Sequence, residues 1–304
     1  MKDLTKGKIS TLILGFAIPV FLGNLLQLTY SLADTRIVGS FLGERSLAAV
    51  GATTTISNLI VGFLLGLANG FAIITAQKFG AGDKKRVRRS FAIALVLGVI
   101  ISAVLMLIGT VFIKPILGFL NVLGKLFIEA KQYILIIIIG LWVTMFYDIL
   151  MAVMRAIGDT LTPLLILAIS VGLNIALDLL FVAVWKTGTW GAAAATVLAQ
   201  FIALVICCFY MIHKYELLRL NKNDFKDLES KMIKEMLATG MSMGFMSSLV
   251  NIGSLTLQTA INKLGQEIIV AHTAARKITE IYMIMFSVFG QTMATFCGQN
   301  MGAR

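Results

Sequence analysis

The sequence predicts an all-α integral membrane protein, a polytopic helix bundle, and three observations carry that prediction. Hydrophobic residues make up 58% of the 304 residues and charged residues only 13%, whereas a soluble domain carries about 25% charged residues. The apolar residues form continuous runs, and a bilayer core of ~30 Å is crossed by about 20 such residues as a helix. The charged residues gather in short clusters between these runs.

The apolar runs predict eight membrane helices. The first run follows a basic start and is too long for the core of a signal peptide, so a first membrane helix is expected there. None of the runs alternates in hydrophobicity as the strands of an outer-membrane barrel do. The expected helices cover 10–38, 46–77, 89–113, 132–154, 162–185, 190–213, 233–262 and 267–300.

The basic residues lie between these helices, and their distribution over the two sides of the membrane indicates the orientation of the chain. One side is expected to carry the N-terminal lysines, the cluster at 78–89, Arg155 and the lysines and arginine of 214–234. The other side has only Arg45, Lys114, Lys125, Lys131, Lys186 and Lys263. Because cytoplasmic loops carry the excess of Lys and Arg, the N-terminus is predicted to be cytoplasmic. The net charge of +11 therefore belongs to loops at the membrane and does not indicate a nucleic-acid partner.

An internal repeat divides the chain. Residues 42–81 align without gaps to 264–303, and the two segments share an "LG" start and a "Q-x-x-GA" end. The copies contain the second and the eighth helix, so the period is six helices and both copies have the same orientation, as in transporters with two six-helix halves.

The repeat predicts a six-helix N-lobe at 1–213, a cytoplasmic linker at 214–232 and the first two helices of a second, parallel-repeat lobe at 233–304. The mixed charges of the linker are typical of a solvated helix. A complete second lobe needs about four more helices, so a chain truncated after its eighth helix is expected.

Three carboxylates, Asp34, Asp148 and Asp178, lie inside expected helices. A charged group at the bilayer centre costs about 2.5–3.5 kcal/mol on insertion scales, so each is a candidate functional residue. Asp148 lies two turns before Arg155, and both a structural pair and a cavity-lining role fit it. Asp34 also fits the external end of its long helix.

Counting residues along the helices predicts that four polar side chains meet. Asn174 and Asp178 share one face of the fifth helix at spacing i,i+4, and at ~1.5 Å per residue Asp178 lies about 24 Å along it. The same count places Thr196 about 9 Å down the sixth helix, at a similar level. Asp34 lies near the outer part of the first helix. The alternative is that each polar group only hydrogen-bonds to a neighbouring helix and holds the bundle together.

The first helix carries further candidates. Gln27, Tyr30 and Asp34 share one of its faces at spacings of three and four residues. Pro19 removes one helical hydrogen bond and is expected to kink the helix.

Enzymatic chemistry is not indicated. The three cysteines, Cys207, Cys208 and Cys297, lie in apolar runs without CxxC or Cys/His spacing, so neither a metal site nor a disulfide framework is expected. No nucleophile–base set or phosphate-binding loop is present in the sequence.

The chain resembles the multidrug and toxic compound extrusion (MATE) family of secondary transporters, in its prokaryotic DinF-like branch. The matching stretches occur in order over the whole chain: "FAIPVFLGNLLQLTYSLADTRIVG", "LAAVG", "QKFGAGD", "MRAIGDTLTP", "NIALDLLF", "WGAAAAT" and "GQNMGA". The resemblance implies two six-helix lobes around a central cleft, and export of cationic or amphipathic compounds across a bacterial or archaeal cytoplasmic membrane. We expect a monomer whose partners are membrane lipid and small-molecule substrates.

The resemblance also assigns roles to residues. A polar cluster implicated in cation coupling in that branch matches Asp34, Asn174, Asp178 and Thr196. The residues that the family places at the substrate cavity and the bend of the first helix match Pro19, Gln27 and Tyr30.

The coupling ion and the function each have alternatives. No cofactor is implied beyond H⁺ or Na⁺ as the coupling ion, and Na⁺ would be held by oxygens of Asp34, Asn174 and Asp178. A lipid-linked oligosaccharide flippase of the same superfamily, which is expected to carry basic residues in its cavity, and an inactive transporter fragment remain as alternative functions.

Overall fold

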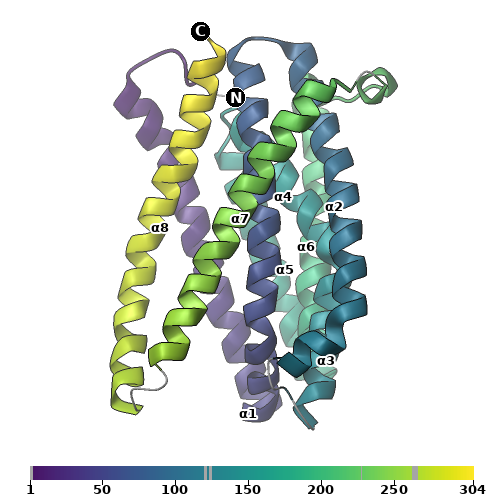
Figure 1. The fold of residues 1–304 in the computed structure, drawn as a ribbon, viewed down its shortest axis with the longest axis vertical. Helices are drawn as coiled ribbons and strands as arrows, with labels where there is room; N and C mark the ends of the chain where they lie inside the picture. The colour runs from purple at the N-terminus through teal and green to yellow at the C-terminus, as the bar shows by residue number, and fades with distance from the viewer. Residues whose placement is uncertain (1–2, 120–121, 123–124, 227, 262–265) are drawn as a thin grey trace.

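The computed structural model describes residues 3–119, 122, 125–226, 228–261 and 266–304. Every regular element in these residues is helical, which confirms the predicted fold class. The α-helices lie roughly along one axis, and both termini are at the same end of the bundle (Figure 1). Their bounds are α1 Ile9–Gly80, α2 Lys84–Phe119, α3 Lys125–Ile139, α4 Leu141–Ala156, α5 Leu161–Asp178, α6 Thr189–Lys214, α7 Ser230–Ile261 and α8 Gln266–Gly302.

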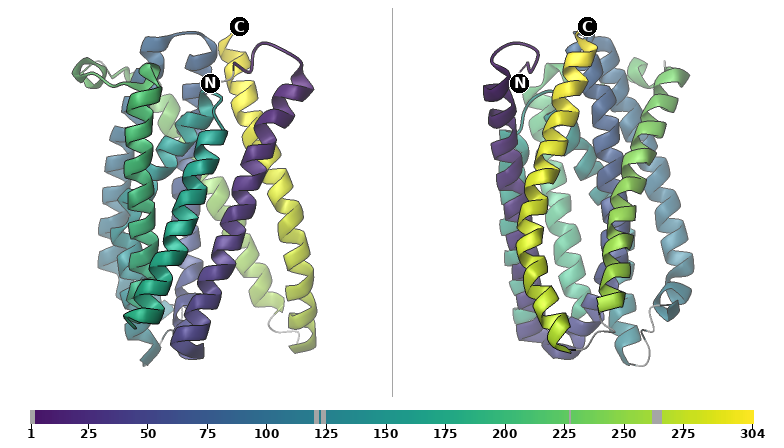
Figure 2. Two further views of the ribbon diagram at one scale, coloured as in Figure 1. Left: turned by 180° about the vertical axis from the view of Figure 1, so that it is seen from behind. Right: turned by 60° about the vertical axis from the view of Figure 1, so that its left-hand side comes forward.

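The first two expected helices form one element, α1, which turns back on itself at Gly43 (Figure 2). Gly43 has φ 84° and ψ 175°, backbone angles that a residue with a Cβ avoids. A single glycine therefore replaces the short loop that the apolar runs predict. The kink expected at Pro19 is not a break in the helix, because within Ile9–Gly80 only Gly43 departs from helical backbone angles.

The fourth expected helix, 132–154, is two helices. α3 begins at Lys125, earlier than expected, and meets α4 at an angle of 46° around Gly140. A Cβ at Gly140 would lie 2.5 Å from a methyl carbon of Val197, so the absence of a side chain lets the bend lie against α6. The fifth helix matches the expected span, but its last turn, Leu179–Val184, is a π-helix.

The described helices identify a membrane protein. By length and apolar composition, α1, α2, α5 with its π-helical end, and α6 can each cross a membrane, and the bent pair of α3 and α4 adds a fifth span. Since α1 contains two of the expected helices, these elements correspond to the six helices expected in 1–213. Membrane crossing by α7 and α8 stays a prediction.

The linker is not the solvated helix that its charges suggest. It forms two short 3-10 turns, Glu216–Leu218 and Lys222–Phe225. Asp224 is buried and lies 3.6 Å from Nε of Arg88 on α2. The connection is therefore fixed to the end of the bundle, and its role as a boundary between two lobes stays a prediction.

The two copies of the repeat meet at their "Q-x-x-GA" ends. A Cβ at Gly80 would lie 1.9 Å from the backbone oxygen of Gln299, and a Cβ at Gly302 would lie 1.8 Å from that of Gln77. Glycines at a helix crossing let two backbones touch, and here each copy provides the glycine that accommodates the other. α8 and α1 consequently cross in direct contact near the end of the bundle that carries both termini (Figure 1).

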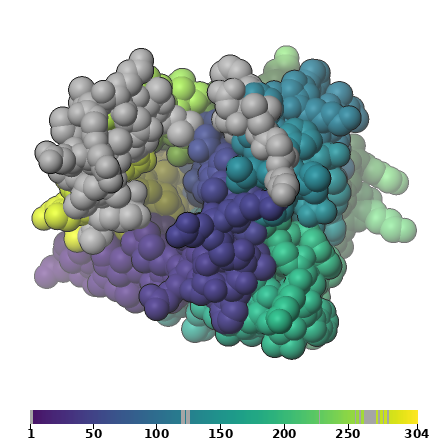
Figure 3. Space-filling model, turned by 90° about the horizontal axis from the view of Figure 1, so that it is seen from below, coloured from purple at the N-terminus to yellow at the C-terminus, as the bar shows by residue number. Residues whose placement is uncertain are grey.

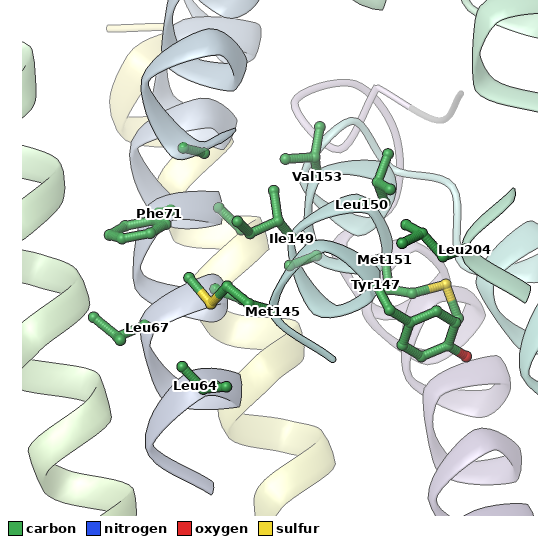
Figure 4. Packing of buried hydrophobic residues seen from close by; sticks show 14 of the residues in the cluster. Leu64, Leu67, Phe71, Met145, Tyr147, Ile149, Leu150, Met151, Val153 and Leu204 are labelled. Carbon is green, nitrogen blue, oxygen red and sulfur yellow. The ribbon is translucent and has the colours of Figure 1, made fainter. Parts of the chain in front are cut away.

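The largest hydrophobic cluster packs α4 against the second half of α1 and extends to α2, α3, α6 and α7. Leu67 and Phe71 pack toward Met145 and Ile149 (Figure 4). Tyr147 extends away from Phe71, with its hydroxyl at the far side of α4 (Figure 4). α4 thus has one face in the core and another available to line a cavity.

Candidate functional site

The structure brings together the four side chains that the residue count placed at one level. Asp34 comes from the first half of α1, Asn174 and Asp178 come from the last turns of α5, and Thr196 comes from α6. Tyr30, one turn before Asp34, joins them. These five residues are called the polar cluster below.

Hydrogen bonds connect the polar cluster from α1 to α5. The hydroxyls of Tyr30 and Thr196 are 3.2 Å apart. An amide atom of Asn174 lies 3.3 Å from Oγ1 of Thr196. The other amide atom faces Oδ2 of Asp178 at 2.9 Å. Three helices therefore meet through one continuous set of polar contacts.

The Asn174 amide fits its neighbours in one orientation. With Nδ2 toward Asp178 it donates to the carboxylate Oδ2 at 2.9 Å, and its Oδ1 accepts from the backbone N–H and the hydroxyl of Thr196 at 3.2 Å and 3.3 Å. With the amide reversed, its oxygen would face the carboxylate oxygen and its N–H groups would face the backbone N–H of Thr196. Asn174 therefore acts as a donor to Asp178 and an acceptor from Thr196.

Asp34 and Asp178 lie within hydrogen-bonding reach of each other. Asp178 is completely buried, and Oδ1 of each carboxyl group has no hydrogen-bond partner among the described residues. Two bare carboxylates so close together in a low-dielectric setting repel each other. A proton or a cation between them relieves the repulsion, and carboxylate, amide and hydroxyl oxygens are the ligands that a hard cation prefers.

Tyr133 of α3 belongs to the same site, although its sequence context does not predict this. Tyr133 is 9% exposed and packs in a cluster with Ile37 and Val182. It lies close enough to Asp34 and Asp178 to interact with them electrostatically. The stretch "QYILIIII" gives no signal for it, because a lone tyrosine near the end of an apolar run is an ordinary membrane-interface residue.

A cavity of about 140 Å³ adjoins the polar cluster. Tyr30, Asn174 and Thr196 belong both to the polar cluster and to the cavity wall. Gln27 and Pro19 also line the cavity. From the end opposite to the termini, the surface is hollowed between α1 and α8 (Figure 3).

Comparison with known proteins identifies the family. A family model described as MatE matches residues 19–180, more than half of the chain. The chain belongs to the MATE family. The matched segment begins at Pro19 and includes Asp34, Asn174 and Asp178, whereas Thr196 lies beyond it.

MATE relatives match nearly the whole chain. The "Probable multidrug resistance protein YpnP" of Bacillus subtilis is 29% identical over 99% of this chain and 67% of its own length. The "FAD transporter" of Shewanella oneidensis is 24% identical over 100% of this chain and 68% of its own length. The chain thus spans about two thirds of the length of these relatives.

Solved MATE structures share the fold. The "Outward-facing conformation of a multidrug resistance MATE family transporter of the MOP superfamily" superimposes with a TM-score of 0.91, covering 99% of this chain and 67% of that one at 23% sequence identity. At that identity the likeness establishes the fold, and the roles of the polar-cluster residues remain to be argued from their geometry.

Proposed function

We propose that this MATE protein is a secondary active multidrug exporter, which couples an inward flow of H⁺ or Na⁺ to the export of amphipathic or cationic compounds. The observation that carries the proposal is the buried contact between Asp34 and Asp178, which is linked to a cavity wall through Asn174 and Thr196. We place the protein in a bacterial or archaeal cytoplasmic membrane with a cytoplasmic N-terminus, because the basic residues favour that orientation.

The polar contacts provide a route from the cation to the cavity. A proton or a cation on Asp178 weakens the hydrogen bond that its carboxylate accepts from Asn174 at 2.9 Å. Asn174 also contacts Thr196, whose hydroxyl lies 3.2 Å from that of Tyr30 on α1. Loss or gain of the cation therefore alters how α1 packs on α6, at residues that line the cavity.

The coupling ion has two candidates with different chemistry. A proton would be shared between the carboxyl groups of Asp34 and Asp178. A sodium ion would instead be coordinated by their free oxygens together with the Asn174 and Thr196 oxygens. Both ions would bind at the same site. Substrate export is therefore expected to require the two aspartates whichever ion is coupled.

The names of the two relatives support a transporter and leave the substrate open. One relative is named for multidrug resistance and the other for FAD transport. A lipid-linked oligosaccharide flippase is the second candidate function, because Arg155 lines the cavity and a flippase is expected to hold anionic lipid groups with such a residue.

Gradient-driven transport tests the proposal. The protein is reconstituted in vesicles, and the vesicles are loaded with a fluorescent lipophilic cation. The movement of this dye across the membrane is followed under an imposed proton or sodium gradient. One of the two gradients is expected to drive the dye against its concentration difference. The proposal is wrong if neither gradient does so, and movement of a fluorescent lipid-linked saccharide in the same vesicles would establish the flippase instead.

A further inference from the structure

The cavity contains two opposite charges that the cation-coupling proposal does not use. Asp148 and Arg155 both line it, together with Thr144, Tyr147 and Met151. These five residues form one stripe of α4, since spacings of three, four and seven residues return to the same helix face. The view of the core shows Tyr147 extending away from the packed side of α4 (Figure 4).

Asp148 keeps unused hydrogen-bonding capacity on the cavity wall. Oδ2 of Asp148 is buried and has no hydrogen-bond partner among the described residues. The hydroxyl of Tyr147, a side chain that is 7% exposed, makes no hydrogen bond of ordinary geometry to any described residue, although Ser170 of α5 lies close enough to interact with it. Because buried polar groups are nearly always paired with protein or water, the free oxygen of Asp148 is available to a polar ligand in the cavity.

Arg155 is also incompletely occupied. In the described part of the chain its side chain makes one long hydrogen bond, 3.4 Å from Nη2 to Oδ1 of Asn69, although a guanidinium carries five N–H donors. No ion pair within 4.0 Å joins Arg155 to Asp148 or to any other carboxylate in the described part of the chain. A pair whose purpose is structural is expected to make direct contact, because separated charges leave the cost of desolvation uncompensated.

We propose that Asp148 and Arg155 form a dipolar subsite that binds zwitterionic substrates. The Asp148 carboxylate receives a cationic amine, and the Arg155 guanidinium receives a carboxylate or phosphate of the same molecule. Apolar side chains between and opposite them, including Leu164, Leu167 and Met151, contact the body of the substrate. This inference rests on the proposal that the cavity binds the transported compound, and it names the class of compound.

The subsite is distinct from the polar cluster. Thr144 on α4 bonds to Gln200 on α6 at 2.8 Å, which sets the two helices level at that point. Asp148 lies one turn beyond Thr144 toward the end that carries both termini, and Thr196 lies one turn from Gln200 in the opposite direction. At ~1.5 Å per residue Asp148 and Thr196 are about 12 Å apart along the bundle axis.

Equilibrium binding without any ion gradient tests the subsite. The whole chain in lipid nanodiscs is titrated with rhodamine B, a zwitterion, and with its methyl ester, a cation with the same chromophore, and binding is followed by fluorescence polarisation against empty nanodiscs. The wild-type protein is expected to bind the zwitterion about tenfold more tightly, since a charge-assisted hydrogen bond is lost in the ester. Asp148→Asn weakens both dyes. Arg155→Gln weakens only the zwitterion and removes the preference.

Matched controls separate this effect from general damage. Asp83→Asn and Arg304→Gln make the same chemical changes at positions outside the cavity wall and are expected to leave both affinities unchanged. Arg155→Lys keeps the charge and is expected to keep the preference for the zwitterion.

Two results overturn the subsite. One is equal affinity of the wild-type protein for the ester and the zwitterion. This result refutes the subsite even if a variant does not fold. The other is an Arg155→Gln variant that keeps the wild-type preference. Both results leave the gradient-driven transport assay unaffected, so failure of the subsite is distinct from failure of the proposed function.

Discussion

Replacing Gln299 with leucine is expected to lower the free energy of unfolding substantially, because this one side chain ties α8 to two distant segments. Gln299 is completely buried. Its Oε1 accepts from the backbone N–H of Leu4 at 2.9 Å, and its Nε2 donates to the backbone oxygen of Ala156 at 2.7 Å. Leucine fills a similar volume and can make neither bond.

The magnitude follows from the two backbone groups that lose their partner. Leu4 is 1% exposed and Ala156 is 0% exposed, so water does not replace the lost bonds. A buried polar group left without a partner costs about 1–3 kcal/mol. With some compensation from the added apolar contact of leucine, the expected loss is about 2–4 kcal/mol.

Unfolding by SDS in mixed micelles measures this loss, and the repeat provides the matched control. Gln77 is the counterpart of Gln299 in the first copy, and its side chain makes no hydrogen bond in the described part of the chain. Gln77→Leu is therefore expected to change the free energy of unfolding by less than about 1 kcal/mol. Equal losses in the two variants, or no loss for Gln299→Leu, would refute the reasoning.

Two further predictions concern the same end of the bundle. Gly80→Ala is expected to destabilise the protein by about 1–3 kcal/mol or more, because its Cβ would lie 1.9 Å from a backbone oxygen of α8. Gly51→Ala, where nothing lies within 4 Å, should cause no loss in the same SDS titration, because alanine is favoured over glycine inside a helix by about 0.5–1 kcal/mol. Burial would raise the pKa of Asp159, but hydrogen bonds from Tyr215 and Thr162 hold it below the ordinary 3.8. The resulting stability is present above that pH and is lost as the pH falls through the folded-state pKa. Thermal unfolding between pH 7 and pH 3 should show this loss in the wild type and a smaller one in Asp159→Asn, and identical pH profiles would contradict it.

The level of the polar cluster was predictable from the sequence because helices translate residue number into depth. Asn174 and Asp178 had to share a face at spacing i,i+4, and the count along two antiparallel helices placed Thr196 beside them. The actual contact depends on how each helix is rotated about its axis, which residue counting does not determine. Tyr133 was missed for that reason, since only the packing of α3 turns it toward the carboxylates.

The departures from the expected helices arise at single residues. Gly43 ends one half of α1 and begins the other, so two apolar runs become one element. Gly140 allows α3 and α4 to bend by 46° within one apolar run, which hydrophobicity alone does not reveal. The repeat gave Gly80 and Gly302 as matched positions, but their contact across a helix crossing is a tertiary feature.

The linker shows the limit of charge patterns. Alternating acidic and basic residues in 214–232 are typical of a solvated helix, yet Asp224 is buried in an ion pair with Arg88. The sequence shows which linker residues are charged but not which residues they contact. The ion pair of Asp224 with Arg88 on α2 holds the linker against the bundle, where it forms short 3-10 turns and not the expected helix.

The central claim is that Asp34 and Asp178 form the cation-coupling site, and export under an ion gradient tests it most directly. Asp34→Asn and Asp178→Asn are compared with the wild type in vesicles under the gradient that drives the wild-type protein. Asp83→Asn serves as the control, since asparagine caps a helix as well as aspartate does. We predict that both cluster variants fold and lose gradient-driven export to the level of empty vesicles while Asp83→Asn retains it. Normal export by both cluster variants would contradict the account.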